Sequence, residues 1–172
     1  WLKPPILAPA EEGRRLIDSI GWAAILPQML AALGAVFALA GVGEIIGEMA
    51  GSAIPEGSVF LTVVVFALGM ALFTMIMGNA FAAFPVMAAA IGVPLLVEEY
   101  GGDPAVIGAV GMLAGFCGTL LTPMAANFNI VPAALLELKD QNAVIRQQIG
   151  TAVPIWVCNV VIIYVGAFLI WS

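Results

Sequence analysis

Polar side chains within the long apolar stretches of this sequence gather at two places. The first is Gly78-Asn79, in TMIMGNAFAAFP, with Thr74 one helical turn before it. The second is Thr122-Pro123, in GTLLTPMAANFNIVP, and the polar residues that flank it are Thr119, Asn127 and Asn129. Neutral amide and hydroxyl oxygens suit coordination of Na⁺ and binding of a small carboxylate or amide. They do not suit redox chemistry or hydrolysis.

Glycine, proline and asparagine at these points predict a break in each helix. Backbone groups without partners at membrane depth cost several kcal/mol each unless protein or a water-filled cavity receives them. At a break, freed carbonyl groups can hold a cation, and the amino terminus of the next half-helix attracts an anion. The alternative is that the amides only cap or join helices. Two breaks with clustered polar side chains favour transport over a scaffold role.

The distribution of charge indicates what kind of protein positions these breaks. The 172 residues include eleven acidic and five basic ones, and no histidine. Four stretches of 25, 41, 33 and 26 residues carry no charge: 19–43, 57–97, 104–136 and 147–172. A soluble chain would place charge on every surface helix, whereas about 20 apolar residues suffice for one helix to cross a bilayer. The sequence therefore predicts an all-α polytopic membrane protein.

The same composition excludes several functional classes. Five basic residues leave no patch for nucleic acid. Without histidine, the usual zinc and haem ligand sets and the Ser-His and Cys-His catalytic pairs are missing. Cys117 and Cys158 lie in apolar stretches, which is typical of small buried hydrophobic residues. We therefore expect no enzyme, no cofactor and no metal beyond a transported Na⁺.

Two of the uncharged segments are too long for a single straight crossing. Residues 58–92 as one helix would measure about 52 Å, against a bilayer core of about 30 Å. Residues 104–137 present the same excess, and each segment contains one break. Each segment is either a broken helix that crosses or a re-entrant hairpin that enters and leaves on one side.

Basic residues, which favour the cytoplasmic side of a membrane, distinguish these possibilities. Arg14 and Arg15 precede the first span, and Lys139 and Arg146 precede the last, whereas the other loops are purely acidic. These four basic residues are all cytoplasmic only if the hairpin is the earlier segment and the broken span the later one. One transmembrane domain, residues 1–172, then contains an interfacial or solvated helix at 10–21, a span at 22–50, a re-entrant hairpin at 58–92, a broken span at 104–137 and a span at 151–172 that ends at Trp171.

Glycines predict where these helices approach one another closely. Gly43, Gly47 and Gly51 recur at four-residue spacing near the end of the first span, beside Glu44 and Glu48. Such spacing forms a smooth face for another helix. The two glutamates could relay protons, but we favour the interpretation that they mark the end of the helix. The later broken span has a second glycine face: Gly108, Gly111, Gly115 and Gly118.

The motifs TMIMGNAFAAFPVM (74–87) and GMLAGFCGTLLTPMAANFNIVPAALLEL (111–138) resemble a bacterial membrane family of unknown function. That family is often described as one of two subunits of a 5-oxoproline (pyroglutamate) transporter. The order of segments resembles one half of the ion-transporter superfamily fold, to which citrate, dicarboxylate and arsenite-type carriers belong. A hairpin that enters from outside matches the C-terminal repeat. The resemblance implies a multi-pass protein of the bacterial cytoplasmic (inner) membrane.

Carried over to this chain, the resemblance implies a cation and substrate site formed by the hairpin tip, Gly78 and Asn79, and the following break. At that break it implicates Thr119, Thr122, Pro123 and Asn127, and our own interpretation adds Asn129. The superfamily tip is typically Ser-Asn-Thr but here is Gly-Asn-Ala, so the coupling ion can be Na⁺ or H⁺. The superfamily fold needs two inverted halves. A complementary half must therefore come from upstream sequence, a second membrane subunit or another copy in an oligomer.

We therefore expect a subunit or half of a secondary active transporter for a small organic anion. The resemblance names 5-oxoproline as the leading substrate, and ion-coupled alternating access is the expected mechanism. One alternative is a non-transporting scaffold or accessory subunit, in which helices pack against both breaks without a cavity. The other alternative is a channel.

Overall fold

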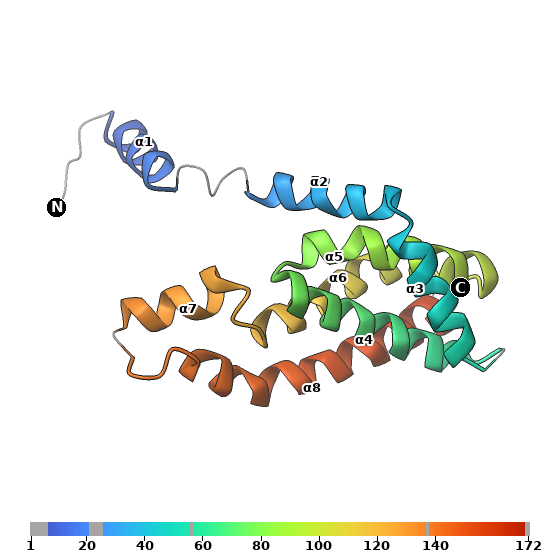
Figure 1. The fold of residues 1–172 in the computed structure, drawn as a ribbon. Coiled ribbons are helices and arrows are strands. Elements are labelled where there is room, and N and C mark those ends of the chain that lie inside the picture. Colours follow the sequence, from blue (N-terminus) through green and yellow to red (C-terminus); the bar gives the residue numbers. More distant parts are fainter. Residues whose placement is uncertain (1–6, 21–25, 56, 137, 171–172) are drawn as a thin grey trace.

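The computed structural model describes residues 7–20, 26–55, 57–136 and 138–170, and every regular element within these ranges is a helix (Figure 1). The predicted all-α class is therefore confirmed for the described part of the chain. Trp171, which we expected at the membrane interface, lies outside these ranges.

The described part of the amino-terminal third forms three helices. Helix α1 (Ala8–Ile20) covers most of the segment expected at the interface and stands apart from the other helices in Figure 1. The apolar segment that we predicted as one span, 22–50, is divided into α2 (Leu26–Leu39) and α3 (Val42–Ala53). Between them Gly41 has a φ of 74°, which glycine adopts without steric cost. Neither described helix reaches 18 residues, so the described part of this segment forms two shorter helices rather than one.

The next segment is a helical hairpin that turns at the predicted break. Helix α4 (Val59–Met77) ends at Gly78-Asn79, and α5 (Ala80–Met87) and the π-helix η2 (Ala88–Glu99) return along it. The return is antiparallel, because Gly69 on α4 faces Met87, whereas Gly92 faces Phe66 nearer the start of α4. The chain therefore reverses at Gly78-Asn79 and does not continue as a broken crossing helix.

The later segment is a broken helix, as predicted. Helix α6 (Pro104–Leu120) begins at Asp103, whose carboxylate accepts a hydrogen bond from the amide of Val106 at 2.9 Å. After the break, α7 (Ala126–Leu135) continues beyond the end of α6 (Figure 1). The chain then returns through α8 (Ala143–Val165) and the short π-helix η3 (Gly166–Ile170).

Three of the four α6 glycines, Gly111, Gly115 and Gly118, form the predicted packing face against α4, whereas Gly108 meets only Phe84 of α5 at 3.8 Å. Phe66 of α4 contacts the backbone at Gly111, and Met70 contacts it at Gly115, so α4 and α6 run parallel. Helix α8 runs antiparallel to both, and the indole nitrogen of Trp156 donates a hydrogen bond to the carbonyl of Ala67 at 3.0 Å. The largest side chains of this core are fully buried: Val63, Phe66, Met70, Met87, Ile91, Leu96 and Ile163.

The first glycine face packs within the chain in the same way. A Cβ atom at Gly47 would lie 3.0 Å from the carbonyl oxygen of Ala90, and one at Gly43 would lie 3.5 Å from that of Val86. Nothing lies within 4 Å of a Cβ atom at Gly51. Gly43 and Gly47 therefore join α3 to the second arm of the hairpin, and Gly51 does not take part.

Among the described residues, three helical stretches are long and apolar enough to cross a membrane: Val59–Met77, Ala80–Glu99 and Ala143–Ile170. Three spans were predicted, at 22–50, 104–137 and 151–172. Of the three observed stretches, only Ala143–Ile170 corresponds to a predicted span, and it begins eight residues earlier than predicted. The other two are the arms of the hairpin, with 19 and 20 residues, whereas α6 has 17. At 1.5 Å per residue each arm measures about 30 Å, so its length alone permits a full crossing.

Candidate functional site

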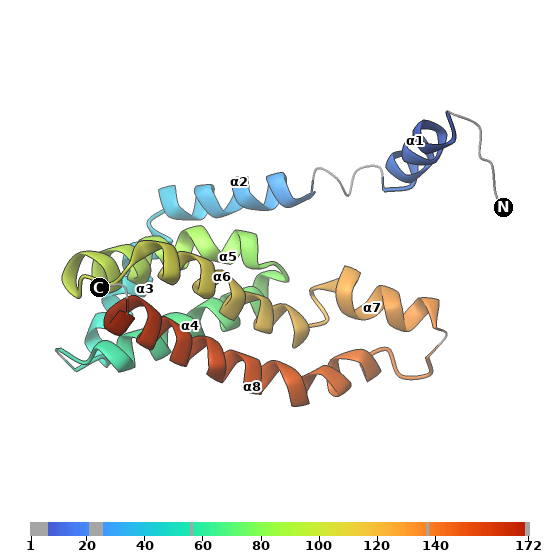
Figure 2. The same cartoon turned by 180° about the vertical axis from the view of Figure 1, so that it is seen from behind.

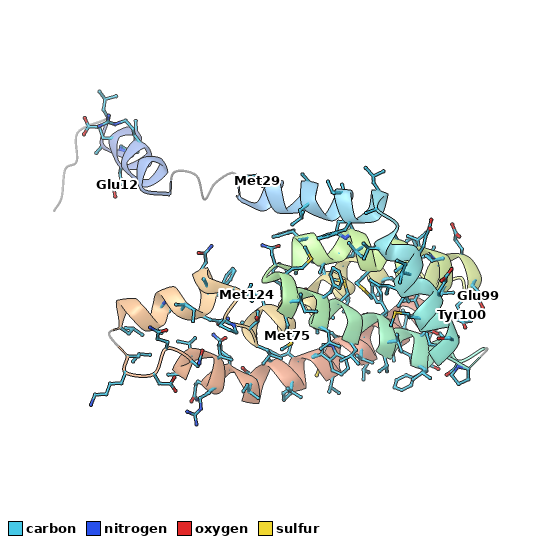
Figure 3. All side chains as sticks on the ribbon, in the orientation of Figure 1. Glu12, Met29, Met75, Glu99, Tyr100 and Met124 are labelled. Atoms are coloured by element: carbon cyan, nitrogen blue, oxygen red, sulfur yellow. The ribbon has the colours of Figure 1, made fainter. Side chains whose placement is uncertain are left out.

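The two predicted breaks meet in the folded chain. The Thr122 hydroxyl donates a hydrogen bond to the carbonyl of Met75 at 2.8 Å and accepts one from the amide of Met124 at 3.2 Å. A Cβ atom at Gly78 would lie only 2.6 Å from the carbonyl oxygen of Met124, so the two backbones touch. Figure 3 labels Met75 and Met124, one from each segment, close to each other. The hairpin tip and the broken helix therefore form one site.

Local geometry explains the hairpin tip. Gly78 has a φ of 74°, and its amide donates to the carbonyl of Thr74 at 2.7 Å, which closes α4. Asn79 is extended, and its side-chain oxygen accepts a hydrogen bond from the amide of Phe81 at 2.7 Å. An amide side chain at this position satisfies one of the free N–H groups that begin a helix. Asn79 is therefore the N-cap of α5.

Asn129 holds the second break from inside. Its side-chain nitrogen donates to the carbonyls of Thr119 and Thr122, at 2.9 and 2.6 Å, and the residue is fully buried. These carbonyls end α6 and lack the amide partners that a continuing helix would supply. The Asn129 side chain replaces those partners, so α6 can end within an apolar environment.

A cleft of about 230 Å³ lies where the two breaks meet. Its lining comes from the hairpin tip and from the residues just after the second break: Met77, Gly78, Asn79, Met124, Ala125, Ala126, Asn127 and Phe128. Helices α5 and α7 both begin in this cleft, and a helix amino terminus carries a partial positive charge. None of the lining side chains is ionisable. The cleft therefore offers amides and helix ends rather than buried ions.

Four buried side-chain oxygens have no hydrogen-bond partner among the described residues, and three of them belong to residues near the breaks: the hydroxyls of Thr74 and Thr119 and the side-chain oxygen of Asn129. The fourth is the side-chain oxygen of Gln148 on α8. Thr74 Oγ1 lies 3.2 Å from the Cβ position of Gly115, on the face where α4 and α6 meet. An unsatisfied buried group costs about 1–3 kcal/mol, so each of these oxygens would gain from a partner. Oxygen atoms of this kind suit hard cations better than soft metals, which prefer sulfur ligands.

The two breaks lie level with the middle of α8. The side-chain nitrogen of Asn159 on α8 lies 3.6 Å from Cys117 Sγ, five residues before Thr122. Because α6 and α8 are antiparallel, Thr122 is level with about residue 154, close to the midpoint of the 28-residue stretch Ala143–Ile170. Figure 2 shows α7 beside the first turns of α8, beyond the hairpin tip.

The structure divides the predicted site residues into two groups. Gly78, Asn79 and Asn127 line the cleft. Thr119, Thr122 and Asn129 are at most 4% exposed and lie behind it, where their side chains or carbonyls join the broken ends. Pro123 is exposed and is not part of the lining. The sequence interpretation missed the apolar lining residues Met77, Met124 and Phe128, for which the only signal was their place next to the breaks.

Fold and site together define a protein whose described residues form only helices, three of them long and apolar enough to span a membrane, and in which two helix breaks share one cleft. The chain belongs to the family described as "Protein of unknown function (DUF979)", whose model matches residues 1–168. No curated protein and no solved structure matches the chain. The match agrees with the predicted membership of a family of unknown function and leaves the substrate to be inferred from the site.

Proposed function

We propose that this chain is one half, or one subunit, of a secondary active transporter for a small organic anion. The observation that carries the proposal is the meeting of two helix breaks in one cleft. Irregular backbone inside a membrane protein is tolerated where it is buried or lines a cavity, and transporters use paired broken helices to bind their cargo. A cleft at the breaks also favours transport over a scaffold, because a scaffold would have no use for it.

The chemistry of the cleft supports an anion that also carries an amide. The amino termini of α5 and α7 favour a carboxylate, and Asn79 and Asn127 offer amide groups that both donate and accept. 5-Oxoproline is a compact ring with one carboxylate and one lactam amide, so its groups match this set. We propose it as the leading substrate, in keeping with the resemblance of the two motifs.

We propose Na⁺ rather than H⁺ as the coupling ion. The buried oxygens of Thr74, Thr119 and Asn129 are available as ligands. A proton has no carrier among the lining side chains, because none of them titrates. Glu44 and Glu48, considered above as relay groups, are exposed on α3 and do not line the cleft. H⁺ coupling would therefore require the substrate carboxylate, or a group of the complementary half, to carry the proton.

The position of the breaks also supports a re-entrant hairpin and a complementary half. A tip level with the middle of α8 suits a hairpin that enters the membrane and turns within it. Met124 is 65% exposed and Phe128 is 55% exposed, although both line the cleft. A second subunit or another copy, with inverted topology, would cover them and complete the site for alternating access in a bacterial cytoplasmic membrane.

Uptake of labelled 5-oxoproline by proteoliposomes tests this function. The chain is reconstituted with any membrane subunit that co-purifies, and uptake is measured with an inward Na⁺ gradient, with a pH gradient and with neither. We expect saturable uptake that the Na⁺ gradient drives. Flux that does not saturate and follows voltage linearly would indicate a channel. Absence of uptake of 5-oxoproline and of other small carboxylates under every gradient would favour the accessory role.

A further inference from the structure

A second hollow lies beside the two breaks, between α4, α6 and α8. We propose that this groove holds one acyl chain of a membrane lipid. The groove has a volume of about 230 Å³, and its walls include Leu68, Leu72, Met75, Leu121, Val153 and Trp156. It shares no lining residue with the cleft. The proposal goes beyond transport and does not depend on it.

The chemistry of the walls excludes a polar occupant. The indole N–H of Trp156 is already donated to the carbonyl of Ala67 at 3.0 Å, and the thiol of Cys117 donates to the carbonyl of Leu113 at 3.5 Å. The remaining wall side chains are aliphatic or methionine. An apolar groove without free hydrogen-bonding groups does not favour water or an anion. The occupant must therefore be apolar.

The size of the groove favours a single chain over a helix. Its volume equals that of about eight water molecules at roughly 30 Å³ each. An α-helix with its side chains is about 10–12 Å wide and would not enter such a space. From Leu68 to Met75 the groove follows α4 for two turns, about 10 Å at 1.5 Å per residue. A narrow, extended hydrocarbon segment fits this shape.

The depth of the groove identifies the source of that hydrocarbon. Trp156 lies at the middle of Ala143–Ile170, a stretch long and apolar enough to cross a membrane, and the interior of a bilayer consists of acyl chains. The rim residues Leu68, Leu72 and Val153 are 44–49% exposed and face outward from the bundle. Lipid chains therefore reach the opening directly.

The occupant would also contact both breaks from outside the cleft. Met75 and Leu121 belong to the groove, the carbonyl of Met75 accepts the Thr122 hydrogen bond, and Leu121 is the first residue after α6. A bound acyl chain would thus support the junction of the hairpin and the broken helix by filling the space behind it.

Quenching of Trp156 fluorescence by brominated lipid tests the proposal. The full chain, with any co-purifying subunit, carries Trp1, Trp22 and Trp171 as phenylalanine and is placed in phosphatidylcholine vesicles with bromine near the middle of the acyl chains. The reference protein has Trp156→Phe and Val157→Trp, which moves the indole to a neighbouring lipid-facing position that is 48% exposed. Trp156 is only half-buried, so burial alone predicts weaker quenching than in the reference. A chain in the groove predicts quenching at least as strong.

A matched pair of substitutions then locates the contact. Val153 and Val161 lie on α8 and are 48% and 49% exposed, but only Val153 lines the groove. We expect Val153→Phe to fill the groove and reduce the quenching of Trp156, and Val161→Phe to leave it unchanged. Leu72→Phe serves instead if Val153→Phe does not insert.

Weaker quenching of Trp156 than of the reference, or no effect of groove filling, would overturn the proposal. Protection of Trp156 that appears only in an oligomer would also overturn it and assign the groove to a second copy. None of these readouts measures uptake, so failure of transport leaves the result interpretable.

Discussion

Asn127 and Asn129 lie two residues apart on α7 and have opposite environments. Asn127 is exposed and lines the cleft, whereas Asn129 is fully buried and binds two carbonyl groups. The same residue type therefore serves two purposes at one break. We expect Asn127 to contact a ligand and Asn129 to stabilise the fold.

Substitution of the cleft asparagines should abolish uptake without loss of the protein. Asn127→Ala removes an amide from the cleft, and Asn79→Ala removes another together with the N-cap of α5, at a cost of about 1 kcal/mol. We expect both variants to insert and to lose 5-oxoproline uptake in proteoliposomes. Asn79→Ser keeps a capping oxygen, so it separates loss of the cap from loss of the amide. Wild-type rates in both alanine variants would contradict the site.

Substitution of the buried asparagine should instead destabilise the protein. Asn129→Leu leaves the carbonyls of Thr119 and Thr122 without their partner, and each unsatisfied group costs about 1–3 kcal/mol. We expect a lower unfolding midpoint in detergent micelles, followed by helical circular dichroism. Asn127→Leu is the matched control and should change the midpoint little. Equal midpoints for the two variants would show that Asn129 does not hold the break.

At the scale of the elements, the glycine face of α6 determines how closely α4 approaches. Gly118 packs directly on the carbonyl group of Ala71, whereas a Cβ atom at Gly108 would meet only the Phe84 ring at 3.8 Å. Backbone cannot move aside as a flexible side chain can. The separation of α4 and α6 therefore depends on the absence of a side chain at Gly118.

Gly118→Ala should accordingly destabilise the bundle, and Gly108→Ala should not. Overpacking of a tight interface typically costs about 1–3 kcal/mol, and here the clash is with backbone. Alanine at position 108 meets only ordinary contacts and favours the helix by about 0.5–1 kcal/mol relative to glycine. The unfolding midpoints of the two variants, both on α6, are compared in detergent micelles. Similar midpoints would mean that α4 can move away from α6 without cost.

At the scale of the whole molecule, the charged ends of the bundle predict its orientation. Asp140 and Arg146 form an ion pair at 3.2 Å near the start of α8, on the far side of the breaks from the acidic turn after η2. Figure 3 shows Glu99 and Tyr100 at that other end. Positive residues favour the cytoplasmic side, so the two ends should face opposite sides of the membrane.

Labelling of single cysteines with a membrane-impermeant maleimide tests this orientation. In a protein with Cys117 and Cys158 replaced by alanine, Asp140→Cys should react only in inside-out vesicles, and Gly101→Cys only in right-side-out vesicles. Both positions are exposed, so access depends on the side of the membrane. Reaction of both cysteines from the same side would show that α6 and α7 do not cross the membrane as one broken span.

Much of this architecture could be predicted because its signals are local. The turn at Gly78-Asn79 and the break after Thr122 lie within overlong apolar segments, where glycine, proline and asparagine interrupt a helix. The turn at Gly41 was missed, because Ala40-Gly41 carries no polar neighbour and the glycine also suits a continuous helix. That turn places Gly43 and Gly47 of α3 against η2, which is a tertiary requirement.

The sequence by itself determined the class of protein and the positions of two helix breaks, because charge content, apolar length and backbone preferences act over a few residues. Only the tertiary structure decided that the breaks share one cleft, since Thr122 and Met75 are 47 residues apart and meet through the packing of α4 on the glycines of α6. The tertiary structure also decided which amide side chains line the cleft and which are buried between helices. Side chains two residues apart on a helix point in different directions, and only the neighbouring helices determine which direction is buried.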